Sequence, residues 1–235
     1  MRWNKFKSLF SKESKTTEGT ATDELTRSTK KVMSEIYEKK RWGGRQKDFY
    51  SGSGSHSRKV VQPYIKTISS FLKDYEDGLI VCDLGCGDFN VGKNLVSYSK
   101  RYIGIDIVDD LIERNKKLFV SEQLEFHCLN IVTDNLPKGD CILVRQVFQH
   151  LSNEEIKKVV KKIEKFKHII VTEHIPKGEF VANAEKSTGA GIRLSNNSGV
   201  VLTEPPFNMN PERSTELLRI KYRKALIVTT HYQNF

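Results

Sequence analysis

Apolar residues along this chain form short runs, and the runs alternate with segments in which apolar positions recur every three or four residues. The runs predict strands at 79–84, 101–106, 124–128, 141–144, 168–172 and 224–232. The helically spaced segments predict helices over 60–72, 90–99, 108–118 and 152–166. Strand and helix alternating in this way predict an α/β fold, a doubly wound and mostly parallel sheet with helices on both faces.

The residues before the first strand divide the chain into a tail, a helix with a loop, and a main domain. Residues 1–22 are predicted to be a basic tail and polar linker, and 23–57 an amphipathic helix followed by a loop. The main domain covers 58–235 and contains an irregular insertion over 176–214. The loop before this domain, rich in Ser and Gly, is either a flexible linker or a lid that closes over a ligand.

The first predicted strand ends in a glycine turn that indicates a nucleoside site. Asp83 lies within the apolar run, and Gly85 and Gly87 follow at alternate positions. These glycines let the backbone turn sharply and approach a ligand that a Cβ would block. The next strand ends at Asp106, where a carboxylate can accept hydrogen bonds from two ribose hydroxyls. A nucleoside is therefore predicted across the carboxyl ends of two parallel strands.

The glycine spacing disfavours a dinucleotide. A pyrophosphate-binding turn has Gly-x-Gly-x-x-Gly, but Asn90 stands at the third glycine position. The order Asp-x-Gly-x-Gly, with an acid one strand further on, resembles motif I of the class I S-adenosylmethionine-dependent methyltransferases. The resemblance runs from about residue 50 to the end. It implies a seven-stranded Rossmann-like sheet, with S-adenosyl-L-methionine as cofactor and S-adenosyl-L-homocysteine as product. The alternative is an ordinary strand–turn–helix crossover.

The resemblance also implies which residues contact the cofactor, at the carboxyl ends of the first four strands. Asn130 stands where the family often has an acid, and we expect it to hydrogen-bond the adenine amino group. Arg145 is either a bidentate donor to a carboxylate or phosphate, or an ordinary ion-pair residue. The predicted cofactor-binding residues are Asp83, Gly85, Cys86, Gly87, Asp88, Asp106, Ile107, Asn130, Ile131, Arg145 and Gln146.

Four segments, RQVFQHLSNEEI, VTEHIP, NSGVVLTEPPF and YSGSGSHS, resemble a narrower bacterial branch of these methyltransferases. Its members are often encoded with enzymes that build capsules, O-antigens and other surface glycans. The resemblance implies O-methylation of a sugar, nucleotide-linked or in a nascent glycan, in surface polysaccharide biosynthesis. We expect the insertion to close over the acceptor, with 205–207 as an apolar wall. The predicted substrate contacts are Tyr50, His56, Arg193, Asn197 and Glu204.

Two histidines near the ends of the fourth and fifth strands are candidates for a general base. A sugar hydroxyl is a weak acid, so a base with a pKa near neutrality is useful. His174 follows the fifth strand beside Glu173, which is placed to orient it, and His150 lies in the loop after the fourth strand. Either histidine is alternatively a packing or hydrogen-bonding residue. No metal is predicted, because Gln146 and Gln149 stand where a related RNA-methylating branch has a glutamate ligand.

The composition indicates an anionic partner without naming it. The 235 residues carry a net charge of +10, which suits nucleic acid, a nucleotide-linked substrate or a membrane surface, or is simply a solvated lysine-rich surface. Residues 1–10 have basic and apolar positions at helical spacing. They either form a helix that contacts a membrane surface weakly, or form a helix docked on the main domain, or are unstructured. The four cysteines read as small buried side chains in a reducing compartment. We expect a cytoplasmic protein, either free or peripheral to the inner face of the membrane.

Three other functions stay open at this stage. The basic charge favours an RNA or tRNA methyltransferase, which should concentrate Lys and Arg on one face with aromatic side chains for stacking. The lysines are instead scattered along every segment of the chain. A non-catalytic nucleoside-binding module and a nicotinamide dehydrogenase are the remaining alternatives. The intact acid and glycine positions disfavour the nucleoside-binding module. The missing third glycine disfavours the dehydrogenase.

Overall fold

The computed structural model describes the backbone of residues 21–235 and the side chains from Thr29 onward. Helix α1 (Ala21–Glu38) begins the described part, two residues before the predicted start of this helix. The rest of the predicted tail, with its proposed membrane contact over residues 1–10, lies outside the described residues. No helix in the described part is long and apolar enough to cross a membrane.

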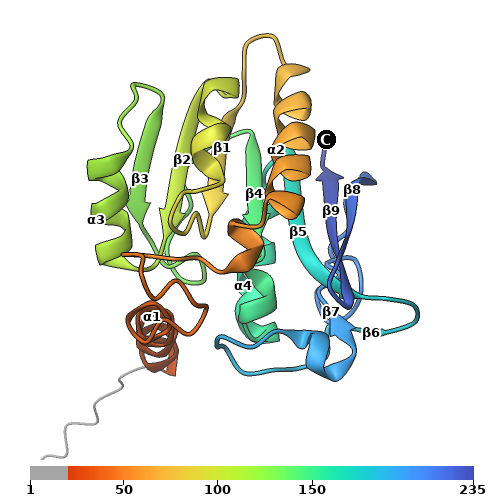
Figure 1. Cartoon of the computed structure of the whole chain (residues 1–235). Helices are drawn as coiled ribbons and strands as arrows, with labels where there is room; N and C mark the ends of the chain where they lie inside the picture. Colours follow the sequence, from red (N-terminus) through yellow and green to blue (C-terminus); the bar gives the residue numbers. More distant parts are fainter. Residues whose placement is uncertain (1–20) are drawn as a thin grey trace, which may run out of the picture.

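A seven-stranded sheet in the order β3-β2-β1-β4-β5-β9-β8 forms the centre of the molecule (Figure 1). The five strands β1 to β5 are parallel, β9 is antiparallel to β5, and β8 is antiparallel to β9. The doubly wound, mostly parallel sheet is thus confirmed. The strands are β1 (Ile80–Leu84), β2 (Arg101–Asp106), β3 (Leu124–Cys128), β4 (Cys141–Arg145), β5 (His168–Pro176), β8 (Arg213–Tyr222) and β9 (Ala225–Gln233).

Alternating side chains of the central strands bury two apolar layers. On one face, Val81 and Leu143 pack with Ile68 of α2 (Arg58–Lys73). On the other face, Leu84 and Val144 pack with residues of α4 (Asn153–Ile163). Side chains of a strand point alternately to opposite faces, so a sheet buried on both faces needs apolar residues at nearly every position. Helix α3 (Asp109–Leu118) lies beside β3 (Figure 1).

One predicted helix differs from the structure. The helix predicted over 90–99 is replaced by two short 3-10 turns, Gly92–Asn94 and Val96–Tyr98. Gly92 lies so close to Phe89 that an added Cβ would be 2.4 Å from the ring, and the glycine, serine and β-branched valines of this segment are poor helix formers.

The far side of the sheet also differs from the prediction. The last strand of the chain, β9, lies between β5 and β8, so that β8 forms the edge. Strand β8 was not predicted, because charged and polar residues occupy most of its positions and no apolar run marks it. The irregular insertion shortens to 177–212 and contains two paired two-residue strands, β6 (Val181–Ala182) and β7 (Ser198–Gly199).

A capping box opens α4, and its glutamate has a second role. The Ser152 side chain accepts the Glu155 N–H, and the Glu155 carboxylate accepts the Ser152 N–H at 2.9 Å. The same buried carboxylate accepts the hydroxyls of Thr29 in α1 and Thr188 in the insertion. Glu155 therefore joins the N-terminal helix and the insertion to one point. Figure 1 shows α1 at the end of the sheet toward which the parallel strands run.

Arg193, one of the predicted substrate contacts, holds the insertion onto the loop after β4. Its side chain is 2% exposed. Its guanidinium donates hydrogen bonds of 2.8–3.0 Å to the carbonyls of Phe148, Leu151 and Ala184 and to Asn153 Oδ1. Five N–H donors in a fixed fork suit this many acceptors in a buried place. These contacts make Arg193 a structural clamp, so the structure does not support its predicted role as a substrate contact.

We predict that Arg193→Met lowers the free energy of unfolding by about 2–4 kcal/mol, because it leaves buried acceptors without their charged donor. Urea unfolding measures the loss. Arg213→Met, at an exposed position of β8, is the matched control and should stay within about 0.5 kcal/mol of wild type. Equal losses in the two variants would contradict the clamp.

A second prediction concerns pH and two buried histidines. His168 Nδ1 lies 3.1 Å from His231 Nε2, and both rings pack against Phe71. Burial lowers the pKa of His231 to about 4, from 6.5, so between these values the unfolded chain binds a proton that the folded protein does not. The stabilisation by the neutral ring is complete above about pH 6.5 and is lost as pH falls toward 4.

His231→Phe should therefore reduce the loss of unfolding free energy between pH 6.5 and 4.5, relative to wild type. Urea unfolding at several pH values gives this slope. Gln233→Phe introduces the same ring on the same strand without removing a titratable group, and it should keep the wild-type slope. An unchanged slope in His231→Phe would show that the pair does not titrate in this way.

Candidate active site

Two adjoining cavities lie at the carboxyl ends of the parallel strands. The larger contains about 810 Å³ of space empty of atoms, part of it open to solvent, and lies between α1 and the ends of β2, β3 and β4. The smaller, about 380 Å³, lies at the glycine turn after β1. Every residue predicted to bind the cofactor lines one of the two. Both cavities are lined by Ser51, Ser55, Gly85, Gly87 and Arg145.

Asp106 stands at the end of β2 in the larger cavity and also holds the glycine turn. Its carboxylate accepts the N–H of Gly87 at 3.0 Å and that of Val108 at 3.2 Å. Burial raises the pKa of this carboxyl above its usual range, and the backbone N–H donors oppose the rise. Each carboxylate oxygen keeps a further lone pair with which to accept a ligand hydroxyl.

Asn130 presents a donor to the larger cavity, not the expected acceptor. Its Oδ1 accepts the Val132 N–H at 2.9 Å. Its Nδ2 is buried and has no hydrogen-bond partner among the described residues. The prediction that Asn130 accepts from an adenine amino group is therefore disfavoured. A buried amide N–H₂ of this kind suits a ring nitrogen, which accepts hydrogen bonds.

The smaller cavity has a carboxyl group on one side and a guanidinium on the other. Asp83 Oδ2 accepts from the Tyr102 hydroxyl at 2.8 Å, and burial raises the pKa of Asp83 to about 6. Arg145 lies over the Tyr64 ring, 4.9 Å from its centroid. Its Nε is buried without a hydrogen-bond partner in the described structure. The cavity therefore offers a negative and a positive partner to one ligand.

The Ser- and Gly-rich loop closes over the glycine turn through Asp88. The Asp88 carboxylate accepts the Ser51 N–H at 3.0 Å and lies 2.6 Å from His56 Nε2. The Ser51 hydroxyl in turn accepts the Asp88 N–H at 2.8 Å. Arg145 donates to the Gly54 carbonyl at 2.7 Å. The lid interpretation of this loop thus agrees with the contacts that it makes.

Tyr50 and His56, predicted as substrate contacts, belong to this closure. Tyr50 stacks on the His56 ring with centroids 4.3 Å apart, and both lie outside the residues that line the two cavities. Asn197 is exposed and donates to the Glu179 carbonyl, and Glu204 is exposed in a turn of the insertion. Their positions do not support contacts with a ligand in the two cavities. Phe207 of the predicted wall is buried in the core.

Glu173 holds the loop after β4 and is turned away from its predicted partner His174. Its carboxylate accepts the N–H groups of Val147, Phe148 and Gln149 at 2.9–3.2 Å. Burial raises the pKa of the Glu173 carboxyl, and the three N–H donors and the Arg193 charge oppose the rise and favour the charged form. Glu173 is 2% exposed, so its position indicates a structural role and not a catalytic one.

The two candidate bases occupy different places. His150 lines the larger cavity, where its ring lies 4.9 Å from that of Trp42. His174 is half-buried, outside both cavities, and its Nδ1 lies 2.8 Å from Gln149 Oε1. Burial lowers the pKa of each imidazole to about 4, so both rings are neutral at pH 7. The described side chains contain no cluster of three His, Cys, Asp or Glu residues that could hold a metal ion.

Sequence reasoning missed the residues that cover the larger cavity. They come from α1 and the turn after it, and from the loops after β3 and β4. The spacing of apolar residues predicted the helix but not which of its faces meets the cavity. The added lining residues are Thr29, Met33, Tyr37, Trp42, Leu129, Val132, Val147, Gln149 and Leu151.

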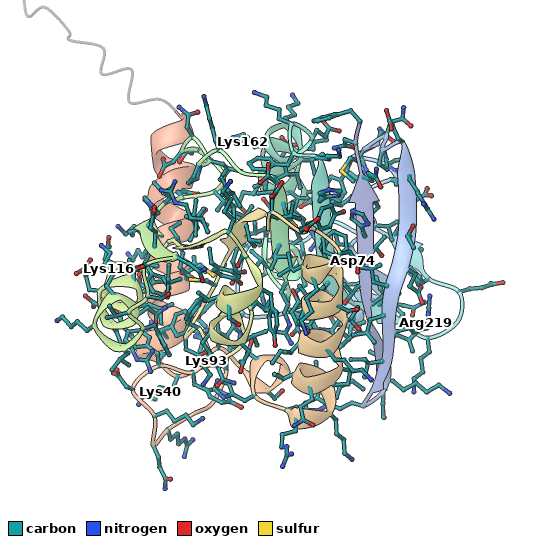
Figure 2. All side chains as sticks on the ribbon, turned by 90° about the horizontal axis from the view of Figure 1, so that it is seen from above. Lys40, Asp74, Lys93, Lys116, Lys162 and Arg219 are labelled. Atoms are coloured by element: carbon teal, nitrogen blue, oxygen red, sulfur yellow. The ribbon has the colours of Figure 1, made fainter. Side chains whose placement is uncertain are left out.

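The positive charges are spread over several elements. In the view of Figure 2, Lys40, Lys93, Lys116, Lys162 and Arg219 lie at separate places around the molecule. Lys40 follows α1, and Lys93 lies in a 3-10 turn. Lys116 lies in α3, Lys162 in α4 and Arg219 on β8. A nucleic acid would be expected to meet cations gathered on one face, and these five do not gather.

Comparison with known proteins finds structures with the same fold and a family model that matches one segment of the sequence. Residues 82–166 match the family model of a methyltransferase domain. The magnesium protoporphyrin IX methyltransferase from Synechocystis PCC 6803, solved with bound SAH, is 18% identical, and the match covers 88% of this chain and 100% of that one with a TM-score of 0.57. No curated protein sequence matches the chain.

Two further structures show the same fold. The N-methyltransferase NodS from Bradyrhizobium japonicum WM9, in complex with SAH, is 12% identical, covers 86% of this chain and 98% of its own, and has a TM-score of 0.59. Human N-acetylserotonin methyltransferase, in complex with SAM, is 15% identical over 86% of this chain and 59% of its own, with a TM-score of 0.56. The chain therefore has the fold of the class I methyltransferases, and its residues 82–166 match a methyltransferase domain.

Proposed function

We propose that this protein is an S-adenosylmethionine-dependent methyltransferase. The observation that carries the proposal is the pair of cavities that adjoin at Gly85 and Gly87, one bordered by Asp106 and the other by Asp83 and Arg145. A nucleoside joined to an amino acid has an apolar ring with hydroxyls at one end and two opposite charges at the other, and the two cavities differ in the same way. The methyltransferases of this fold that were solved with SAM or SAH support the choice of ligand.

The larger cavity suits the adenosine part of the ligand. Asp106 has lone pairs for the two ribose hydroxyls, and Ile107 and Ile131 line the same cavity with apolar side chains suited to a purine ring. The buried Nδ2 of Asn130, which lacks a partner among the described residues, is placed to donate to a ring nitrogen of adenine. A ligand that leaves this group unpaired would bind less tightly, because a buried donor costs about 1–3 kcal/mol when unsatisfied.

The smaller cavity suits the amino-acid part. A carboxylate of Asp83 would pair with the ligand's ammonium, and the guanidinium of Arg145 with its carboxylate. Ammonium binding would stabilise the charged form of Asp83, whose pKa burial raises to about 6 in the protein alone. The hydroxyls of Ser51 and Ser55 border both cavities, where the two parts of the ligand meet.

When bound, S-adenosylmethionine supplies a methyl group on a sulfonium, which is already a strong leaving group. The protein then has to align an acceptor with that methyl group and to exclude water. Ser51 and Ser55 of loop 50–57 and Met33 and Tyr37 of α1 line the larger cavity, where they would limit the access of water to a bound ligand. Since little bond activation is needed, alignment is the main contribution of this chain to the reaction.

For the acceptor we propose a sugar hydroxyl, nucleotide-linked or in a nascent surface glycan, as the segments after β4 and β5 suggest by resemblance. The polar His174 and Tyr222, with ring centroids 6.3 Å apart, support a polar acceptor near the ends of β5 and β8. The separate positions of the five cations labelled in Figure 2 give no support to the RNA alternative.

The cofactor assignment predicts micromolar binding of S-adenosylhomocysteine that Asp106→Asn weakens by about 1–3 kcal/mol, since an amide replaces one of the acceptors for ribose. Isothermal titration calorimetry measures both affinities. Asparagine keeps an acceptor for only one of the two backbone N–H groups that Asp106 holds, so urea unfolding of the variant is compared with that of the wild type. Asp110→Asn, an exposed position on α3, is the matched control. Absence of binding by the wild type would remove the proposal.

The lid contacts give a kinetic prediction. Asp88→Ala removes the acceptor of the Ser51 N–H and the partner of His56, so the loop should open more easily. We expect S-adenosylhomocysteine to dissociate about tenfold faster, equivalent to about 1.4 kcal/mol, in stopped-flow displacement. Asp77→Ala, at an exposed turn, should leave the rate as in wild type. An unchanged rate in Asp88→Ala would mean that the loop does not control release.

A further inference from the structure

Gln149 connects the two candidate bases through its side-chain amide. Its Oε1 lies 2.8 Å from His174 Nδ1, and its Nε2 lies 3.3 Å from His150 Nε2. On the far side, His150 Nδ1 lies 3.1 Å from the carbonyl oxygen of Gly189 in the insertion. Gln149 is 5% exposed. The chain of contacts therefore runs from the half-buried His174, through a buried amide, to a histidine that lines the larger cavity.

The direction of every hydrogen bond in this chain follows from its fixed ends. The Gly189 carbonyl only accepts, so His150 Nδ1 carries the proton. A neutral imidazole has one N–H, so His150 Nε2 accepts and must face a donor, the Gln149 amide nitrogen. The same nitrogen lies 3.4 Å from the Gln146 carbonyl, which also requires a donor. Gln149 Oε1 is left as an acceptor, so His174 Nδ1 donates to it.

Both histidines are thus neutral Nδ1–H tautomers, but they differ in whether their Nε2 is free to accept a proton. Both nitrogens of His150 are engaged, one as donor and one as acceptor. His174 keeps the Nε2 lone pair. We infer that Gln149 is a positioning residue that fixes the tautomer of His174 and makes its Nε2 the proton-accepting atom, while His150 is excluded as the base.

The surroundings of the His150 and His174 rings favour the neutral imidazole that these hydrogen-bond directions require. Burial and the charges of Arg145 and Arg223 disfavour a protonated His174, and burial does the same for His150. Gln149 itself has a defined place because its backbone N–H is held by Glu173 at 3.2 Å. A buried carboxylate therefore sets the position of the amide, and the amide sets the two rings.

The use of this atom in catalysis rests on the proposed methyl transfer. As a lone pair of the acceptor hydroxyl forms a bond to the methyl carbon, the carbon–sulfur bond breaks and its electron pair stays on sulfur. The hydroxyl proton becomes strongly acidic once the new bond forms, so the weakly basic Nε2 of His174 suffices to take it from an acceptor that extends out of the two cavities to this ring. An amide does not readily pass protons on, so Gln149 orients the two rings and does not conduct between them.

The tautomers can be measured without turnover. In protein labelled with ¹⁵N-histidine, long-range ¹H–¹⁵N spectra at pH 7 distinguish a protonated ring nitrogen from one with a lone pair. We expect Nδ1–H and an unprotonated Nε2 at both His174 and His150, assigned with His174→Asn and His150→Asn. An Nε2–H tautomer or an imidazolium at His174 in the wild type would overturn the inference.

Two substitutions at Gln149 test its part. Gln149→Met removes both polar atoms at similar size, so His174 should lose its single tautomer and its two nitrogen shifts should converge. His150 should keep Nδ1–H, because the Gly189 carbonyl remains. Gln149→Glu places a carboxylate between the rings and should raise the pKa of both, since it stabilises an imidazolium. Gln62→Met, at an exposed position of α2, is the matched control and should leave both rings unchanged.

No response of His174 to either substitution would contradict the positioning role of Gln149. Titration of the same samples with S-adenosylhomocysteine separates this outcome from failure of the proposed function. Absence of S-adenosylhomocysteine binding would remove the methyl-transfer reaction and the role of His174 in it. The tautomers measured in the free protein would still decide the inference about Gln149.

Discussion

The loop after β4 keeps its shape because the buried carboxylate of Glu173 accepts three of its backbone N–H groups. Each of these donors would cost about 1–3 kcal/mol if buried without a partner. The loop carries Gln149 and His150, and its carbonyls accept from Arg193 of the insertion. Site and insertion therefore share one anchor. Glu173, which was predicted to orient His174 directly, acts on it only through Gln149.

Buried carboxylates hold the other loops of the site in the same manner. Asp106 accepts the N–H of Gly87 and thereby fixes the glycine turn, and Asp88 accepts that of Ser51 and thereby closes the lid. Glu155 joins the N-terminus of α4 to α1 and to the insertion. Acceptors of this kind order loops that have few apolar contacts of their own. Asp106 and Asp88 also bring negative charge to the two cavities in which the proposed ligand would lie.

Sequence patterns predicted the strands β1 to β5 and the cavity residues at their ends, because apolar runs and glycine turns are local signals. The edge strand β8 gave no such signal, since its residues are mostly polar. Periodicity predicted α1 but not that Met33 and Tyr37 would cover a cavity, which depends on tertiary packing. The role of Arg193 and the tautomer-setting contacts of Gln149 depend on carbonyl groups about 40 residues away along the chain. No residue type or spacing encodes such partners.

The most direct test of the proposed methyltransferase function is a crystal structure of the protein with S-adenosylhomocysteine. We predict that the ribose hydroxyls bind the Asp106 carboxylate, that adenine lies in the larger cavity within reach of Asn130 Nδ2, and that the amino-acid end lies between Asp83 and Arg145. Electron density for the ligand elsewhere, or a bound ligand without contact to Asp106, would contradict the assignment of these cavities.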